Sequence, residues 1–198
     1  ATLAAAGDDF GHIVHESPVA VLVPGSVEDI VRLVKFAGKH GIKVGPARGI
    51  GESHSTQGQA QVAAGVVIDM SALAEIHEIG ANHVVVDAGV RWIDLLAATV
   101  PLGKSPPTLT DFIELSVGGT LSVGGIGGQA YKHGFQVDNV LELTVVTGRG
   151  HKVTCSAHHR ADLFPAVRAG LGQFAVIVKA KLRLVAGEQE EDQGDDCE

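Results

Sequence analysis

A glycine-rich loop from Pro46 to Gln59 contains the residues of this chain that are best suited to bind an anion. It follows a short apolar segment, Ile42–Val44, and it holds three glycines. Glycine adopts positive φ without steric cost, so successive backbone N–H groups can converge on one anion. Arg48 adds a guanidinium group that can form charge-assisted hydrogen bonds to phosphate. Because His54 lies within this loop, we expect it beside a phosphate-bearing ligand, and we interpret the loop as a dinucleotide site.

A second glycine-rich segment runs from Val117 to Gln129, and six of its thirteen residues are glycine. This density of glycine disfavours a regular helix or strand over the whole segment. One interpretation is a flexible linker, but glycine-rich linkers are usually also rich in polar residues. Here valine, leucine and isoleucine alternate with the glycines, so we favour an ordered loop that packs beneath a flat ligand.

Two familiar phosphate-binding motifs are absent. Gly103-Lys104-Ser105 resembles the end of a P-loop, but two prolines follow it and prevent the helix that a P-loop requires. The Rossmann fingerprint also fails, because no third glycine follows Gly49 and Gly51 at the required spacing. The dinucleotide interpretation therefore points to a different fold.

The elements that must position these loops are predicted from hydrophobic patterning and capping signals. Ser26 and Asp29 form a capping-box signature for a helix that ends at Gly41. Further helices are expected over residues 92–99 and 162–169. Strands are expected at 19–23, 42–44, 66–70, 84–88, 141–147, 152–155 and 176–184. The pattern predicts an α+β fold.

The composition indicates a folded, acidic protein. The 198 residues carry a formal net charge of −8, which argues against nucleic-acid binding. Residues 188–198 hold much of this charge, and we expect them to form a disordered acidic tail. Cys155 and Cys197 are too few for a disulfide framework, and the spacing of the histidines near Cys155 predicts no metal site. No apolar run is long enough for a membrane span and no signal peptide is visible, so we expect a cytoplasmic protein without membrane contact.

Several motifs in a fixed order resemble the FAD-binding domain of the cytokinin dehydrogenases, which are PCMH-type flavoproteins of the vanillyl-alcohol-oxidase family. These motifs are Arg48–Ala60, Thr110–Phe112, Val117–Ser122, Gly125–Gly134, Asn139–Leu143, Val153–Ser156, Asp162–Phe164 and Gly170–Phe174. The resemblance extends from about Phe10 to Leu184. It implies a two-lobed PCMH-type FAD-binding domain over residues 1–187, with small α/β subdomains at about 15–72 and about 83–185 and FAD between them.

The resemblance also implies which residues contact FAD. They are Arg48, Gly49, Ile50, Gly51, Ser53, Ser55, Gln59, Thr110, Asp111, Ser116, Gly118, Gly119, Thr120, Ser122, Gly125, Ile126 and Ile177. His54 would carry a covalent bond to the isoalloxazine methyl group. The family pattern is Arg-Gly-x-Gly-His-Ser, whereas Glu52 and Ser53 separate Gly51 from His54 here. Two extra residues can displace the imidazole by up to ~7 Å, so tight but non-covalent binding of FAD is the alternative.

The reaction that the resemblance implies is transfer of a hydride to the flavin from a carbon next to an amine, or from an alcohol carbon. Asp111 matches the family's carboxylate, which takes a proton from the substrate amine. The alternative for Asp111 is a structural role, capping the turn that follows the prolines.

In the cytokinin dehydrogenases a substrate domain follows the flavin domain, and this sequence contains none. Three interpretations follow. The chain is a single-domain FAD-dependent oxidoreductase, or a flavin-binding or electron-transfer module completed by a partner chain, or a remnant of a longer enzyme. An apolar face that the second domain would cover also favours a homo-oligomer or a partner protein.

Overall fold

The computed structural model describes residues 3–51 and 53–187 of the chain. Strands and helices are mixed along this length, which confirms the predicted α+β class. The expected acidic tail at 188–198, with Cys197, and Glu52 lie outside the described residues. No helix within the described ranges is both long enough and apolar enough to cross a membrane.

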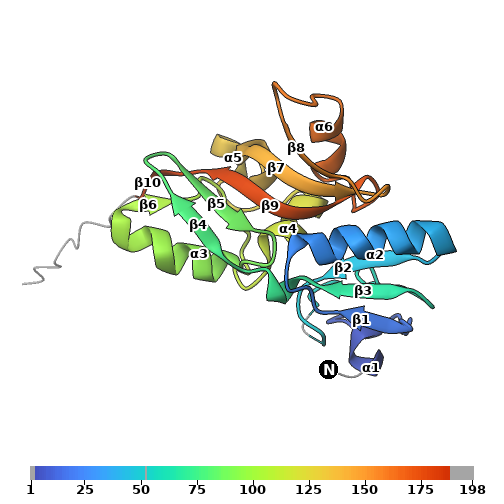
Figure 1. The fold of residues 1–198 in the computed structure, drawn as a ribbon. Helices are drawn as coiled ribbons and strands as arrows, with labels where there is room; N and C mark the ends of the chain where they lie inside the picture. The colour runs from blue at the N-terminus through green and yellow to red at the C-terminus, as the bar shows by residue number, and fades with distance from the viewer. Residues whose placement is uncertain (1–2, 52, 188–198) are drawn as a thin grey trace, which may run out of the picture.

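A parallel sheet of three strands forms the first part of the fold (Figure 1). Its strands are β1 (Ala20–Leu22), β3 (Val66–Asp69) and β2 (Val44–Ala47), in that spatial order. Parallel strands need crossover connections, and α2 (Val27–His40) connects β1 to β2, the two strands that flank β3. One face of this helix is buried as predicted, through Ile30, Val31, Val34 and Ala37.

Both ends of α2 follow from local sequence. The Asp29 carboxylate accepts hydrogen bonds from the Ser26 N–H at 2.9 Å and the Ser26 hydroxyl at 3.2 Å. Gly41 ends the helix in the left-handed conformation with φ 66°, and the Ile42 N–H then donates to the Ala37 carbonyl at 2.9 Å. The strand predicted at 42–44 was placed too early, because Ile42 completes this helix cap and β2 begins only at Val44.

An antiparallel sheet of five strands forms the second part of the fold. Its spatial order is β4 (Ile76–Ile79), β5 (His83–Asp87), β9 (Ala175–Arg183), β7 (Val140–Thr147) and β8 (Lys152–Ser156). Strands β7 and β8 form a hairpin and confirm the strands expected at 141–147 and 152–155. Strand β4 was not predicted, because a register shift between Ile76 and Glu78 breaks its apolar alternation. A two-stranded pairing joins β10 (Val185–Ala186) to β6 (Lys104–Ser105).

Short helices complete the structure. They are α1 (Leu3–Ala6), α3 (Trp92–Thr99), α4 (Val117–Val123), α5 (Ala130–His133) and α6 (Leu163–Val167), with 3-10 turns at Met70–Ala72, Val100–Leu102 and Gln136–Asn139. The bounds of α3 match the prediction, and α6 confirms the short helix expected near 162–169.

The prediction of a loop over the whole of Val117–Gln129 was wrong for its first half, which is the helix α4. The helix tolerates its glycines because it is stabilised by tertiary contacts. Gly118 has no Cβ and can approach Ala88, and its N–H donates to the Ala88 carbonyl at 2.8 Å. The buried Trp92 indole N–H donates to the Thr120 hydroxyl at 2.9 Å. Packing therefore overrides the low helix propensity of glycine.

One hydrophobic core runs through both sheets. It includes Ile30 and Ile68 beside the parallel sheet, Leu143 and Val178 in the antiparallel sheet, and Leu121 of α4. In Figure 1, α2 lies between the two sheets. The two sheets are thereby held together by buried apolar contacts from α2, which fixes the loops at their ends.

Candidate functional site

The first glycine-rich loop leaves the end of β2, and its glycines have the backbone conformation that the sequence predicts. Gly49, Gly51 and Gly58 have φ values of 71°, 80° and 74°, which disfavour any residue with a Cβ. Two of their amides, however, bind carboxylates of the protein. The Gly49 N–H donates to Asp69 at 3.2 Å, and the Gly58 N–H donates to Asp9 at 2.8 Å. These two N–H groups therefore stabilise the loop itself.

Asp9 is a residue beside the His54 loop that sequence reasoning missed. Its side chain is buried, with 4% exposure, and its carboxylate accepts hydrogen bonds from Ser55, Gly58 and Gly11. Burial raises the pKa of Asp9. These hydrogen bonds and one donated by the His12 backbone N–H lower it by more, so the pKa lies below its usual value. The one residue in the sequence that could have indicated this contact between segments was Gly11. Because it has no Cβ, the chain can pass close to the Thr56 carbonyl.

His54 lies exposed between two aromatic rings from distant parts of the chain. Its ring stacks against Phe10 at 5.9 Å between centroids and contacts Phe112 at 4.6 Å. Because Phe112 is the neighbour of Asp111, the structure brings the segments of these two predicted site residues together. Asp111 is exposed, and within the described residues no hydrogen bond or ion pair engages its carboxylate.

The second half of the other glycine-rich segment packs beside Asp111. A Cβ on Gly127 would overlap the Leu109 carbonyl oxygen, at 1.7 Å, so only glycine permits this contact. A Cβ on Gly125 would likewise overlap the Gln136 side chain, at 2.1 Å from its amide oxygen. Gln136 is 2% exposed, and neither its amide nitrogen nor its amide oxygen has a hydrogen-bond partner. A buried amide without partners is a polar group that a bound ligand can satisfy.

Several predicted FAD-contacting residues have structural partners. The Ser116 hydroxyl accepts from the Gly119 N–H at 3.3 Å and caps α4, and the Ser122 hydroxyl donates to the Gly118 carbonyl at 2.7 Å. The Gln59 amide oxygen accepts from the backbone N–H groups of residues 56 and 57 and shapes its own loop. Thr120 holds the Trp92 indole, as described above. These side chains position the backbone around the site.

The remaining predicted residues divide into exposed and buried positions. Ile126 is 68% exposed, whereas Ile177 is buried in β9. Ile50, Ser53 and Thr110 are half-buried, and the Thr110 hydroxyl donates to the Phe112 carbonyl at 2.8 Å. None of these placements tests the predicted contacts with FAD.

Arg48 lies at the end of β2, where its charge acts on a carboxylate of α3. The pKa of Asp94 is lowered chiefly by hydrogen bonds from Arg91, at 2.7 and 2.8 Å, and the charge of Arg48 lowers it further. A phosphate bound at Arg48 would therefore compete with a nearby carboxylate for its charge.

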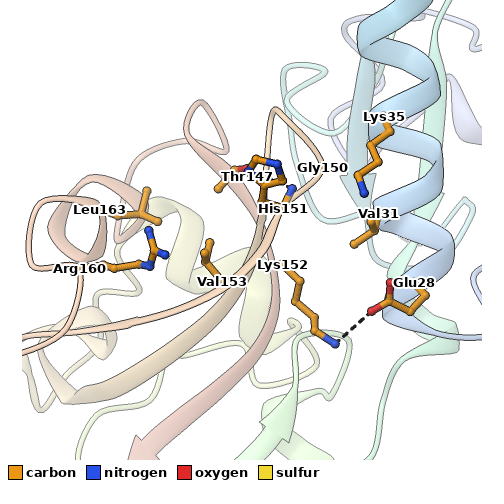
Figure 2. A pocket seen from close by; sticks show the side chains of 10 residues that line it. All are labelled: Glu28, Val31, Lys35, Thr147, Gly150, His151, Lys152, Val153, Arg160 and Leu163. Atoms are coloured by element: carbon orange, nitrogen blue, oxygen red, sulfur yellow. Dashed lines mark hydrogen bonds and ion pairs between the residues drawn. The ribbon is translucent and has the colours of Figure 1, made fainter.

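Two cavities differ in their relation to this site. One of about 380 Å³ is lined by Gly51, Ser53 and His54 together with residues 5, 8, 9, 10 and 12 of the N-terminal segment. The other, of about 500 Å³, lies between α2 and the β7–β8 hairpin, and it contains none of the predicted site residues (Figure 2). Lys152 crosses this second cavity to pair with Glu28 at 3.1 Å. Only the first cavity belongs to the candidate site.

Comparison with known proteins identifies the family of the chain. The family described as FAD binding domain matches residues 18–156. An uncharacterized oxidoreductase, ORF5 in the fasciation locus of Rhodococcoides fascians, is 46% identical over 187 residues, which are 94% of this chain and 42% of that protein. Cytokinin dehydrogenase 4 of Arabidopsis thaliana is 43% identical, over 92% of this chain and 38% of its own length. Cytokinin dehydrogenase 3 of Oryza sativa subsp. japonica is 46% identical, over 92% of this chain and 36% of its own length.

The chain thus spans about two-fifths of the length of these curated relatives. The residues matched by the family include both glycine-rich segments, His54 and Asp111. The cofactor that the family indicates is FAD. The chain belongs to the FAD-binding domain family of flavoproteins.

Proposed function

We propose that this chain is the flavin domain of an FAD-dependent oxidoreductase that takes a hydride from a carbon bonded to an amine or alcohol group. The observation that carries the proposal is the convergence of three segments. His54 contacts Phe112 beside Asp111, and Gly127 packs on Leu109 in the same segment. The names of the relatives, cytokinin dehydrogenase and oxidoreductase, support the same class of reaction.

The residues at this surface fit a dinucleotide cofactor. The unpartnered Gln136 amide offers both a donor and an acceptor next to Gly125. Gly128 is exposed and has no atom within 4 Å of its Cβ position, so its backbone is open to close approach. We propose that FAD lies between the two sheet-containing parts of the domain, contacted by the first loop and by residues 124–128.

The protein's contribution to the reaction is to bind, orient and move a proton. When bound, FAD supplies the oxidation by accepting a hydride from the substrate carbon. The Asp111 carboxylate has no competing partner within the described residues, so it is available to accept a proton from the substrate's N–H or O–H group. Phe112 fixes the backbone of this segment against His54.

The Asp111→Asn variant tests this role. We expect the variant to bind FAD like the wild type but to lose at least about 100-fold in the rate of anaerobic flavin bleaching by an oxidisable amine, the usual contribution of general base catalysis. Glu114→Gln, on the exposed part of the same segment, is the matched control and should keep the wild-type rate. Equal bleaching rates in wild type and Asp111→Asn would contradict the catalytic role and leave Asp111 a structural one.

A second candidate function is a flavin module whose substrate site is completed by another chain or domain. It is favoured by exposed apolar side chains in and just after the second glycine-rich segment, where Ile126 is 68% and Tyr131 is 87% exposed. In this case no amine or alcohol would bleach the flavin of the wild type, and only a redox partner or chemical reductant would do so.

A further inference from the structure

The N-terminal segment forms an arm, residues 8–16, that packs along the loop carrying His54. The Phe10 N–H donates to the Ser53 carbonyl at 3.0 Å, and the Gln61 amide donates to the Val14 carbonyl at 2.8 Å. Gly11 passes so close to Thr56 that a Cβ there would lie 1.9 Å from its carbonyl oxygen. The arm is therefore part of the structure around the candidate site.

Asp9 makes the central contacts of this arm. One of its carboxylate oxygens accepts from both the Ser55 hydroxyl and the Gly58 N–H, each at 2.8 Å, and the other accepts from the Gly11 N–H at 3.1 Å. A buried carboxylate with several donors is stable only while these bonds persist, and they in turn hold both chain segments.

The contacts fall on both sides of His54. Phe10 binds the residue before it through the Ser53 carbonyl and stacks on the imidazole, while Asp9 binds the residue after it through the Ser55 hydroxyl. The three glycines of this loop would otherwise give it many conformations of similar energy. Around His54, the hydrogen bonds of Asp9 and Phe10 favour one of them.

The bond to Asp9 also limits what Ser55 can do. A serine hydroxyl has one proton to donate, and in this structure Ser55 donates it to Asp9. The Ser55 hydroxyl oxygen lies 3.0 Å from the Ser53 hydroxyl and can accept a hydrogen bond from it. The Ser55 side chain therefore cannot also donate to a cofactor phosphate while this bond is intact.

We propose that Asp9 is a positioning residue that holds the His54 loop in the conformation that receives the cofactor, and that Ser55 contributes through its bond to Asp9. The inference rests on the proposed role of this loop in binding FAD. Asp9 itself contacts neither substrate nor cofactor in this account.

Hydrogen–deuterium exchange on the cofactor-free protein tests the positioning role directly. We expect Asp9→Ala to speed amide exchange in residues 53–58 about tenfold, as for loss of one hydrogen bond to a charged group, and to weaken FAD binding by a similar factor. Asp9→Asn keeps one acceptor oxygen and should give smaller changes in the same direction. Since it preserves the size of the side chain, it also serves if Asp9→Ala fails to fold.

Asp8→Asn is the matched control, because the Asp8 carboxylate bonds to His12 of the arm at 2.9 Å and within the described residues to no part of the loop. It should leave exchange in residues 53–58 unchanged. Unchanged exchange in both Asp9 variants would overturn the proposal, as would faster exchange with unchanged FAD affinity. If wild type binds no FAD, the proposed function fails, while the exchange data still decide whether Asp9 orders the loop.

Discussion

At the scale of single residues, the proposed covalent attachment of FAD depends on His54. Its imidazole is exposed and held between the rings of Phe10 and Phe112, so it is accessible to a reactive group while its position is restricted. Glu52 and Ser53 lengthen the loop before it relative to the family pattern. The contacts with Phe10 and Phe112 nevertheless bring its ring beside the Asp111 segment.

A covalent bond through His54 can be tested by denaturation. We expect the acid-denatured wild type to keep its yellow colour and the mass of one attached FAD, whereas His54→Ala binds FAD only in the native state. His12→Ala, which removes another exposed imidazole nearby, should behave like the wild type. If denatured wild type releases all of its FAD, attachment is non-covalent.

Sequence reasoning succeeded at this scale where partners are local. At each end of α2, the capping residue and its partner lie within a few residues of each other. The roles of Ser26, Asp29 and Gly41 were therefore predictable. The burial of Asp9 was not, because its partners Ser55 and Gly58 lie 46 and 49 residues away. The loop amides were expected to point at a ligand, and nothing in the sequence indicated that two of them bind the protein's own carboxylates.

At the scale of elements, α4 shows why the second glycine-rich segment was misjudged. Counting glycines measures the local cost of forming a helix, which is about 1 kcal/mol for each. The contacts that offset this cost are non-local, namely Gly118 on Ala88 and Trp92 on Thr120. The rest of the segment, from Gly124 to Gln129, is the ordered loop that the sequence favoured.

Substitution of Gly118 by alanine tests this packing. In an isolated helix the change would stabilise, but here the new Cβ would lie 2.8 Å from the Ala88 Cβ and 3.1 Å from its carbonyl oxygen. We expect the free energy of unfolding to fall by about 1–3 kcal/mol in urea titrations. At Gly128 an added Cβ would meet no atom within 4 Å, so Gly128→Ala should change the free energy of unfolding by less than about 0.5 kcal/mol. A stabilised Gly118→Ala protein would contradict the packing account.

At the scale of the whole molecule, carboxylates with lowered pKa values occur in the arm, in α2 and in α3. Asp9 is buried in the arm, Asp29 caps α2 beside Arg32, and Asp94 pairs with Arg91 on α3. Asp29 and Asp94 lie in partly solvated positions, where ion pairs contribute little. Of these three carboxylates, Asp9 is therefore the one whose protonation we expect to lower stability most.

The direction of the pH dependence follows from the lowered pKa of Asp9. Its stabilising contribution is complete above the unfolded pKa of 3.8 and is lost as the pH falls through the lower folded value. We expect the urea midpoint of the wild type to drop as the pH falls below about 4, and this drop to be smaller in Asp9→Asn. Glu114→Gln, which alters an exposed carboxylate, should follow the wild-type curve. A wild-type curve that is flat over this range would contradict the assignment.

The parallel sheet has one further consequence, for the behaviour of the chain at high concentration. Strand β1 has only three residues and lies between Pro18 and Pro24. At the opposite edge, Pro46 leaves β2 without one backbone N–H donor. Proline lacks an N–H and cannot continue a ladder, so these prolines make both borders of this sheet poorer templates for a strand of another molecule. They therefore disfavour edge-to-edge aggregation through this sheet.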